Sequence, residues 1–188
     1  MAHPIKHFKV ITRHWHRVIA HCIKAGIFWQ GLFHDLSKYT LTEFVPGARY
    51  FQGTRSPNEM EREIFGYSNA WMHHKGRNRH HFEYWTDYNP KTKVMEPVEM
   101  PDRYIIEMFC DRVAASKIYG GKNYTDDYAL NYYLRGCDTR RIHPKTAKKI
   151  EYLLRHLAEH GEKETFALIR RCRKSGLDTS LQFVNTPE

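Results

Sequence analysis

The chain has 188 residues, of which 41% are hydrophobic and 14% aromatic, and its formal net charge is +9. This composition is too apolar for a disordered chain, and no stretch approaches the roughly 20 apolar residues that cross a bilayer. The N-terminus has no apolar run followed by a small-residue cleavage site, so we expect a cytoplasmic protein without a membrane partner. The positive charge suits an anionic partner such as a nucleotide, phosphate ester or nucleic acid, and equally suits solubility alone.

The cysteines are widely spaced and form no Cys-x-x-Cys pair. In a cytoplasmic chain this pattern predicts reduced thiols in the core rather than a zinc ribbon. They are Cys22, Cys110, Cys137 and Cys172.

The first helix is predicted over residues 4–25, where apolar side chains recur every three or four positions. Gly26 follows as a helix stop. A shorter apolar segment, residues 27–33, comes next. Prolines and glycines then favour a loop over residues 40–55.

A further helix is predicted from Ser56, a candidate N-cap that is followed by Pro57 and Glu59. We expect this helix to continue to about Gly76 with an inward apolar stripe. The stripe consists of Met60, Ile64, Tyr67 and Trp71.

The second half of the chain alternates polar and helical segments. A polar surface loop is expected over residues 86–100, and fraying is expected from about Asp178. With no convincing strand pair, the sequence predicts an all-α fold, with a core over residues 1–121 and a C-terminal helical extension over residues 122–188 packed on it. The remaining helices are expected at 101–120, 126–134, 144–160 and 162–174.

The strongest chemical signal lies in the segment from Gly31 to Lys38, where His34 and Asp35 follow an apolar run. A buried carboxylate is costly unless it is paired or binds a metal. A His-Asp dipeptide is common by chance, so the signal needs partners from other helices.

The first helix offers one such partner. His14 flanks its apolar stripe, with His7 and His21 at seven-residue intervals as alternatives. A single histidine in this position is most simply a half-buried ring bonded to a carbonyl. A metal ligand is the alternative when other ligands converge on it.

Histidines also cluster later in the chain. His74 continues the expected stripe, its neighbour His73 points elsewhere, and His80 and His81 follow. Four histidines within nine residues favour metal binding over a solvated loop. Asp111 lies in register with apolar residues of the helix over 101–120, which favours a metal ligand or its orienter over a surface salt bridge.

The order of these residues resembles the HD-domain metal-dependent phosphohydrolase superfamily. More narrowly it is similar to the dinuclear branch that includes the HD-GYP phosphodiesterases, since residues 34–38 match its His-Asp-x-x-Lys motif. The chain has no Gly-Tyr-Pro segment after His81, so cyclic-dinucleotide specificity is not implied. Over most of its length it also resembles a family of small bacterial and phage proteins of unknown function, which implies no activity.

The resemblance implies a compact HD-domain-like helical bundle and a site with one or two divalent transition metal ions (Mn, Fe, Co, Ni or Zn). One ion would be held by His14, His34, Asp35 and Asp111. Asp35 would bridge to a second ion held by His74, His80 and His81. A water activated by the ions would then attack phosphorus.

Four further residues receive roles in this arrangement besides the bridging Asp35. Lys38 would contact substrate phosphate, with Arg77 and Arg79 beside it, although both arginines fit a solvated face nearly as well. Glu43 is the candidate proton carrier for the leaving group. The expected substrate is a phosphorylated small molecule such as a nucleotide.

Two alternatives remain open. The same ligand order occurs in HD-fold di-iron oxygenases. Lys38 and the excess of basic residues favour phosphate chemistry, but neither excludes oxygenation. The chain could instead be a nucleic-acid-binding or interaction protein with a structural or degenerate metal site, because basic clusters recur in its C-terminal half. The sequence does not specify the substrate, the metal or an oligomeric state.

Overall fold

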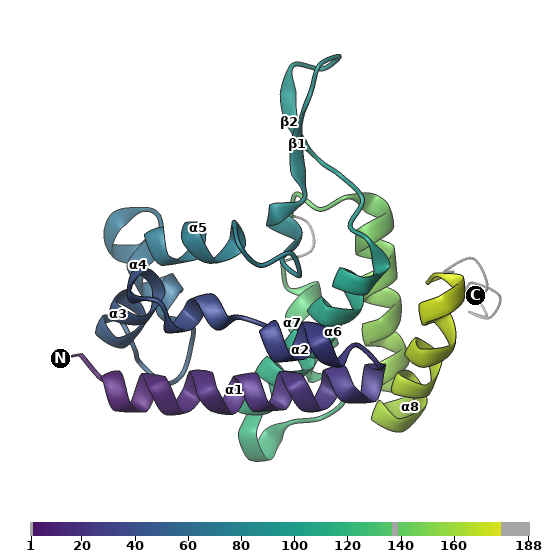
Figure 1. Cartoon of the computed structure of the whole chain (residues 1–188), viewed down its shortest axis with the longest axis horizontal. Helices are drawn as coiled ribbons and strands as arrows, with labels where there is room; N and C mark the ends of the chain where they lie inside the picture. The colour runs from purple at the N-terminus through teal and green to yellow at the C-terminus, as the bar shows by residue number, and fades with distance from the viewer. Residues whose placement is uncertain (1, 137–138, 178–188) are drawn as a thin grey trace.

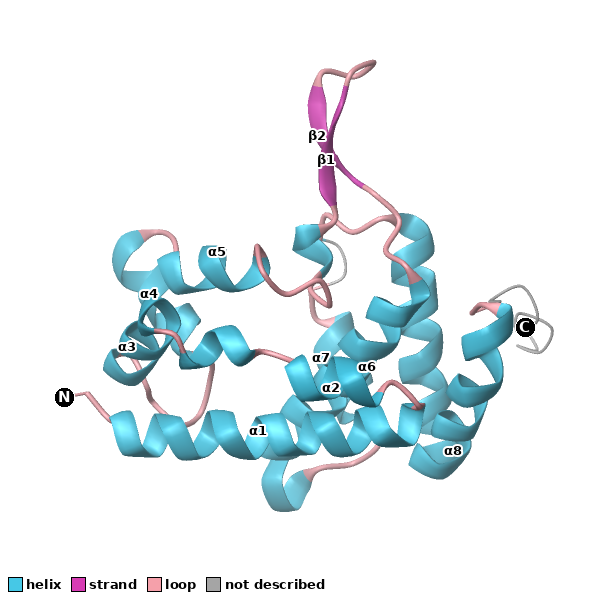
Figure 2. Ribbon diagram, in the orientation of Figure 1, coloured by secondary structure: helices cyan, strands magenta, loops and turns pink. Residues whose placement is uncertain are grey.

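A computed structural model describes residues 2–136 and 139–177 (Figure 1). These residues form eight α-helices and one small two-stranded sheet, which confirms the predicted all-α fold (Figure 2). None of the described helices combines the length and apolar character needed to span a membrane. The helices are α1 (Pro4–Ala25), α2 (Phe28–Phe33), α3 (Leu41–Arg49), α4 (Pro57–Phe65), α5 (Asn69–Lys75), α6 (Asp102–Gly120), α7 (Tyr128–Leu134) and α8 (Pro144–Ser175).

Helix α1 has the bounds that its sequence predicts. Pro4 occupies the first turn, where its missing N–H costs nothing. Gly26 ends the helix with a left-handed backbone (φ 78°), and its N–H bonds back to the carbonyls of the last turn.

Residues 41–49 form helix α3, so the predicted loop over residues 40–55 is wrong in this part. Pro46 lies inside the helix and cannot donate a hydrogen bond to the carbonyl of Thr42. Tertiary packing outweighs this loss, because Gly47 and Ala48 are buried and a β-carbon on Gly47 would overlap the ring of His7 in α1.

The single helix expected from Ser56 to about Gly76 is two helices, α4 and α5. Gly66 ends α4 in a left-handed conformation (φ 80°), and the Ser68 hydroxyl starts α5 by accepting a hydrogen bond from the Trp71 N–H at 3.0 Å. The break rotates the two halves against each other. The expected inward stripe is therefore wrong, since Ile64 and Tyr67 are 51% and 57% exposed.

Residues 86–97 form a β-hairpin where a loop was expected, and that expectation is wrong. Strands β1 (Thr86–Asn89) and β2 (Val94–Pro97) pair antiparallel and project away from the helices (Figure 2). Polar contacts support the turn, with Asn89 and Thr92 donating to Glu96 at 2.6 and 2.5 Å. Strands stabilised by polar side chains leave no apolar alternation in the sequence.

The main core lies where α1, α6 and α8 pack together. The two helices predicted over 144–160 and 162–174 are the halves of α8, which is interrupted by a left-handed Gly161 (φ 73°). Among the described cysteines, Cys22 and Cys110 are buried thiols and Cys172 is partly buried. The expected fraying from Asp178 falls on residues outside the described part of the chain, as does Cys137.

Candidate metal centre

The His-Asp pair lies in a tight turn between α2 and a short 3-10 helix, η1 (Leu36–Tyr39). Asp35 adopts a left-handed backbone (φ 55°, ψ 22°), which non-glycine residues seldom adopt but which aspartate tolerates. Such strained positions concentrate at functional sites. The turn brings both side chains inward, with His34 Nε2 3.2 Å from Asp35 Oδ2.

The first group of converging ligand atoms comes from three elements. Nε2 of His14 in α1 lies 2.9 Å from Oδ1 of Asp111 in α6, and Nε2 of His34 lies 3.5 Å from the same oxygen. With Asp35, these residues can present four ligand atoms that all lie within 4.8 Å of one another. This is the set predicted for the first ion.

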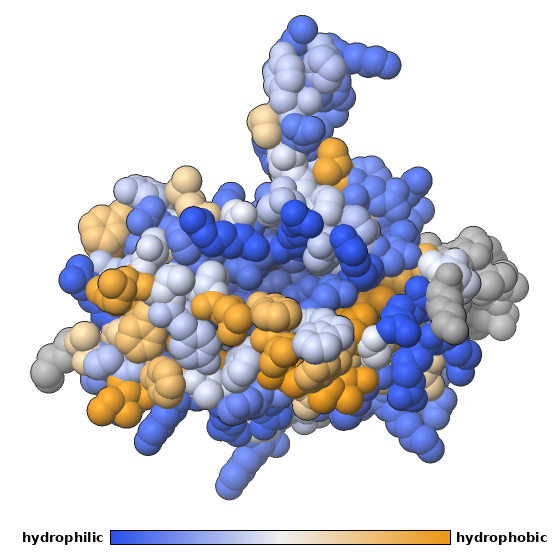
Figure 3. All heavy atoms as spheres, in the orientation of Figure 1, coloured by the Kyte–Doolittle hydropathy of each residue, from blue (hydrophilic) through white to orange (hydrophobic). Residues whose placement is uncertain are grey.

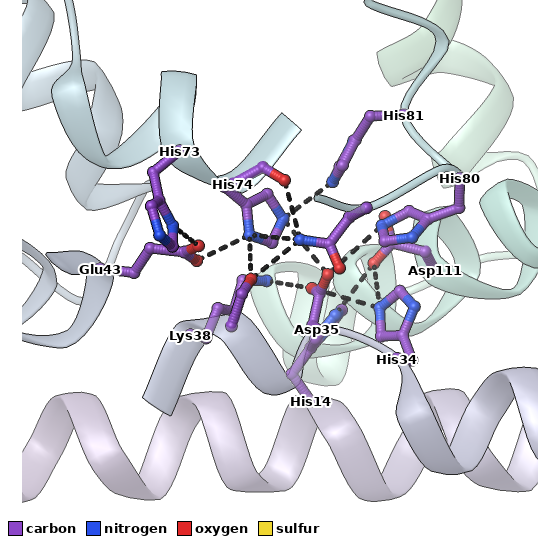
Figure 4. Close-up of polar contacts among 12 residues, drawn as sticks. His14, His34, Asp35, Lys38, Glu43, His73, His74, His80, His81 and Asp111 are labelled. Carbon is purple, nitrogen blue, oxygen red and sulfur yellow. Dashed lines mark hydrogen bonds and ion pairs between the residues drawn. The ribbon is translucent and has the colours of Figure 1, made fainter. Parts of the chain in front are cut away.

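A second group lies on the other side of Asp35 (Figure 4). His74 Nε2 and His80 Nε2 lie 3.2 and 3.4 Å from Asp35 Oδ1. His81 Nε2 lies 2.9 Å from His74 Nε2, so these two rings point their nitrogens at one place. Asp35 is therefore the one residue shared by the two groups.

Several buried atoms of these groups have no hydrogen-bond partner of acceptable geometry. They are His14 Nε2, His34 Nε2, Asp35 Oδ1 and His80 Nε2. An unsatisfied buried polar atom costs about 1–3 kcal/mol, so the cluster is incomplete as a set of hydrogen bonds. A cation would satisfy all four atoms, and imidazole with carboxylate ligands suits divalent transition metals. The residues present therefore fit one or two such ions.

Two buried glutamates hold the histidine rings from behind. Glu43 accepts hydrogen bonds from Nδ1 of His74 at 2.7 Å and from Nδ1 of His73 at 2.6 Å. Glu107 lies 3.1 Å from Nδ1 of His34 and 3.3 Å from Nδ1 of His80. In His34, His74 and His80 the Nδ1 proton is thereby fixed, so Nε2 presents its lone pair to the cluster.

Electrostatics keep the central carboxylate ionised. Burial alone would raise the pKa of the Asp35 carboxyl, but His34 and Lys38 hold it well below its usual value. Nζ of Lys38 lies 2.6 Å from Oδ2 of Asp35. Burial alone would lower the pKa of the lysine, but the negative charge of Asp35 outweighs burial and raises it. Asp111 is likewise held below its usual pKa by His14 and His34 despite its burial.

A cavity of about 400 Å³ leads to the cluster. His14, His74 and Asp111 form part of its wall together with Lys38, and Arg13 and Arg55 also line it. The cavity therefore brings cationic side chains to the same space as the ligand groups.

The structure does not bring the two predicted phosphate-binding arginines into this cavity. Arg77 is exposed and its guanidinium reaches only the carbonyl of His73, at 3.5 Å. Arg79 donates to the Tyr104 hydroxyl at 3.2 Å and stacks on Tyr84. Neither arginine therefore lines the cavity beside Lys38, and their predicted contact with phosphate gains no support from its geometry.

The alternative histidines of α1 lie outside the ligand groups. His7 lines the cavity and packs against Gly47, and burial lowers its pKa to about 4. His21 lies 3.3 Å through Nδ1 from the Cys110 carbonyl. His73 also stays outside the ligand groups, and its Nδ1 bonds to Glu43 at 2.6 Å.

Glu107 and the role of Glu43 were missed by reasoning from the sequence. Glu107 precedes Asp111 by one helical turn, and that spacing places both carboxylates on one face of α6. This signal was present in the sequence. The predicted role of Glu43 as a proton carrier is not favoured, since both its oxygens already bond to histidines.

Comparison with known proteins gives one family. A model described as a family of unknown function (DUF5662) matches residues 3–156. The chain belongs to this family. The match includes both ligand groups and both buried glutamates. No curated protein and no solved structure matches the chain.

Proposed function

We propose that this protein is a metal-dependent phosphohydrolase that acts on a small phosphate ester, such as a nucleotide, at a centre of two divalent ions. The observation that carries the proposal is the pair of ligand groups that share Asp35 and leave four buried ligand atoms without partners. A bridging carboxylate with imidazole ligands on both sides is the donor set that a dinuclear centre needs.

The order of the ligands along the chain supports the same assignment. His14, the His34-Asp35 pair, the later histidines and Asp111 occur in the order that resembles the HD-domain superfamily, and they lie at one point between α1, α5 and α6. Residues that lie nearly a hundred positions apart meet here. Membership of that superfamily is part of the proposal.

Divalent ions held here would supply Lewis-acid activation of a water molecule and of the phosphate group. The chain itself contributes positioning and charge. Glu43 and Glu107 orient the ligand rings, so that the metal-binding nitrogens are arranged before substrate arrives. Lys38 lies beside Asp35 on the cavity wall, where its ammonium group would neutralise phosphate oxygens as charge develops.

The shape of the approach favours a small substrate. The cavity has a volume of about 400 Å³, which lies within the range of pockets that hold small ligands. Arg13 adds a positive charge on this wall, whereas the charge of Arg55 there is paired with Glu63. Phe51 and Ile118 supply apolar surface for the remainder of the ester.

The test combines metal analysis of the purified protein with phosphate release from p-nitrophenyl phosphate, bis-p-nitrophenyl phosphate and a panel of nucleotides. We expect close to two ions per chain and turnover that chelation abolishes and Mn²⁺ or another divalent ion restores. Asp35→Ala and His34→Ala should lose metal and activity with an unchanged helical circular dichroism spectrum. His16→Ala, an exposed histidine of α1, is the matched control.

Three outcomes would contradict the proposal. Full turnover of the Asp35→Ala variant would show that the site is misassigned. Metal binding without phosphate release from any substrate in the panel would argue against hydrolysis. Oxygen uptake by the iron-loaded protein would identify the oxygenase alternative.

Lys38→Ala should raise KM while metal remains bound, because the lysine contacts phosphate rather than the ions.

A further inference from the structure

We propose that the outer apolar face of the α1–α3 region binds a second copy of this chain and makes the protein a symmetric dimer. This face is defined by nine large side chains from α1, α2, η1 and α3. They are Ile5, Phe8, Ile23, Phe28, Trp29, Phe33, Leu36, Leu41 and Val45.

The side chains of this face are far more exposed than apolar residues in a folded core. Their exposed fractions range from 41% for Phe28 to 79% for Leu41. In the space-filling view, apolar surface gathers in a band along the side of the molecule formed by α1, α2 and α3 (Figure 3). Contiguous apolar patches beyond a few hundred Å² are uncommon on monomers and mark interaction sites.

The area of the face agrees with what a stable dimer needs. Trp29 and Phe33 are 69% and 64% exposed, and a large aromatic side chain has on the order of 200 Å² of surface. At their exposed fractions, the nine side chains together offer roughly 800–1,000 Å² of surface, close to the roughly 800 Å² that each partner contributes to a standard interface.

The middle of this face is uncharged, and the basic residues Lys9, Arg13 and Arg17 of α1 lie beside it near Phe8. Between residues 27 and 42 the only residues with a formal charge are Asp35 and Lys38, and these pair with each other at 2.6 Å. Two chains of charge +9 limit their mutual repulsion when the segment between residues 27 and 42 forms the centre of the contact.

Helix α1 supplies the long axis of the interface. Besides the stripe that enters the core, it has a second uncharged stripe at steps of three and four residues, which is exposed at its ends, at Ile5, Phe8 and Ile23. The middle of the stripe (Thr12, Trp15 and Ile19) packs against η1 and α2, which present their own exposed apolar side chains there. This stripe spans about 27 Å at 1.5 Å per residue. An elongated face of this kind pairs with itself across a two-fold axis.

The proposed interface lies directly outside the ligand turn. Phe33 precedes and Leu36 follows the His34-Asp35 pair, so their exposed side chains cover the outer side of the segment whose inner side holds the ligands. A partner packed there would restrain the strained backbone of Asp35. The dimer is nevertheless independent of the proposed chemistry, since the face exists whatever the centre binds.

The test is sedimentation equilibrium of the full-length chain from about 1 to 100 µM, the range in which an interface of this size is expected to associate. The wild type should have twice the chain mass of 22.5 kDa. The double variant Trp29→Glu/Phe33→Glu should have the mass of one chain with an unchanged helical circular dichroism spectrum. Val94→Glu/Met95→Glu, which changes two exposed apolar residues of the hairpin, should remain a dimer.

The proposal is overturned if the wild type stays at 22.5 kDa throughout this range, or if Trp29→Glu/Phe33→Glu leaves the dimer intact. A single substitution, Leu41→Glu, repeats the test in case the double variant does not fold. Flotation of a monomeric wild type with phosphatidylcholine–phosphatidylserine vesicles, lost in the same variants, would instead assign the face to a membrane.

Discussion

The carboxylate of Glu43 lies 2.7 Å from Nδ1 of His74, and the opposite nitrogen of this ring lies 3.2 Å from Asp35. A residue of α3 therefore sets the orientation of a candidate metal ligand on α5. Glu43→Gln would weaken this restraint without adding or removing bulk. We expect binding of the second ion to weaken by about 10–100-fold, the usual effect of losing a carboxylate behind a ligand histidine.

Calorimetric titration of the metal-free variant with Mn²⁺ or Zn²⁺ would measure this change. The control is Glu159→Gln, an exposed glutamate of α8. Unchanged affinity for both ions in Glu43→Gln would show that the orientation of His74 does not depend on this carboxylate.

Glu107 should contribute a pH-dependent part of the stability. Burial alone would raise its pKa, but His34 and His80 lower the pKa of this carboxyl from 4.5 to about 2. A carboxylate whose pKa is lowered by folding stabilises the folded state at pH values above 4.5, its ordinary pKa. This contribution is lost as the pH falls from 4.5 to 2. Glu107→Gln should lose on the order of 2–3 kcal/mol at neutral pH and show a shallower loss in acid.

Urea unfolding of the metal-free chain at several pH values between 7 and about 2.5 tests this expectation. Parallel curves for the wild type and Glu107→Gln across the acid range would contradict it. Glu159→Gln again serves as the control, because its side chain is exposed.

Gly47 should be intolerant of a side chain although its backbone is ordinary helix. A β-carbon there would overlap the His7 ring, which also packs against Phe44 and Phe51 at centroid distances of 5.4 and 5.8 Å. Gly47→Ala should cost about 1–3 kcal/mol, the usual cost of overpacking. The double variant His7→Ala/Gly47→Ala should recover part of this loss, and additive losses in urea unfolding would refute the contact.

His21 should make the fold less stable in mild acid. Burial and the charge of Lys117 lower the pKa of its ring from 6.5 to about 4. Between these values the unfolded chain binds a proton that the folded chain does not, so the free energy of unfolding falls as the pH falls from 6.5 to 4. His21→Gln should make this decline shallower, by on the order of 2–3 kcal/mol over the window at most.

The measurement is urea unfolding at pH values from 7 to 4, with His16→Gln of the same helix as the control. An identical decline in His21→Gln and the wild type would show that the buried ring does not carry this dependence. The contact between Nδ1 of His21 and the Cys110 carbonyl could be retained in part by glutamine, which separates the titration from the hydrogen bond.

The sequence alone was sufficient to predict the features that depend on near neighbours in the chain. The bounds of α1 follow from Pro4, the three-and-four apolar spacing and Gly26, all of which act within one or two helical turns. Every residue predicted as a metal ligand also enters one of the two ligand groups. His74 is buried as expected, but for a different reason, since α5 is separate from the stripe on α4 that suggested it.

What only the tertiary structure decided depends on contacts across the chain. Helix α3 forms despite Pro46 because α1 packs against Gly47, and Arg79 turns to Tyr104 rather than to the cavity. Glu43 and Glu107 become partners of histidines 31 and 73 residues away, respectively. Local spacing encodes which residues share a helix face. Packing and desolvation energies involve residues that are far apart in the chain. These energies determine which helix faces pack together and which carboxylates are buried beside an imidazole.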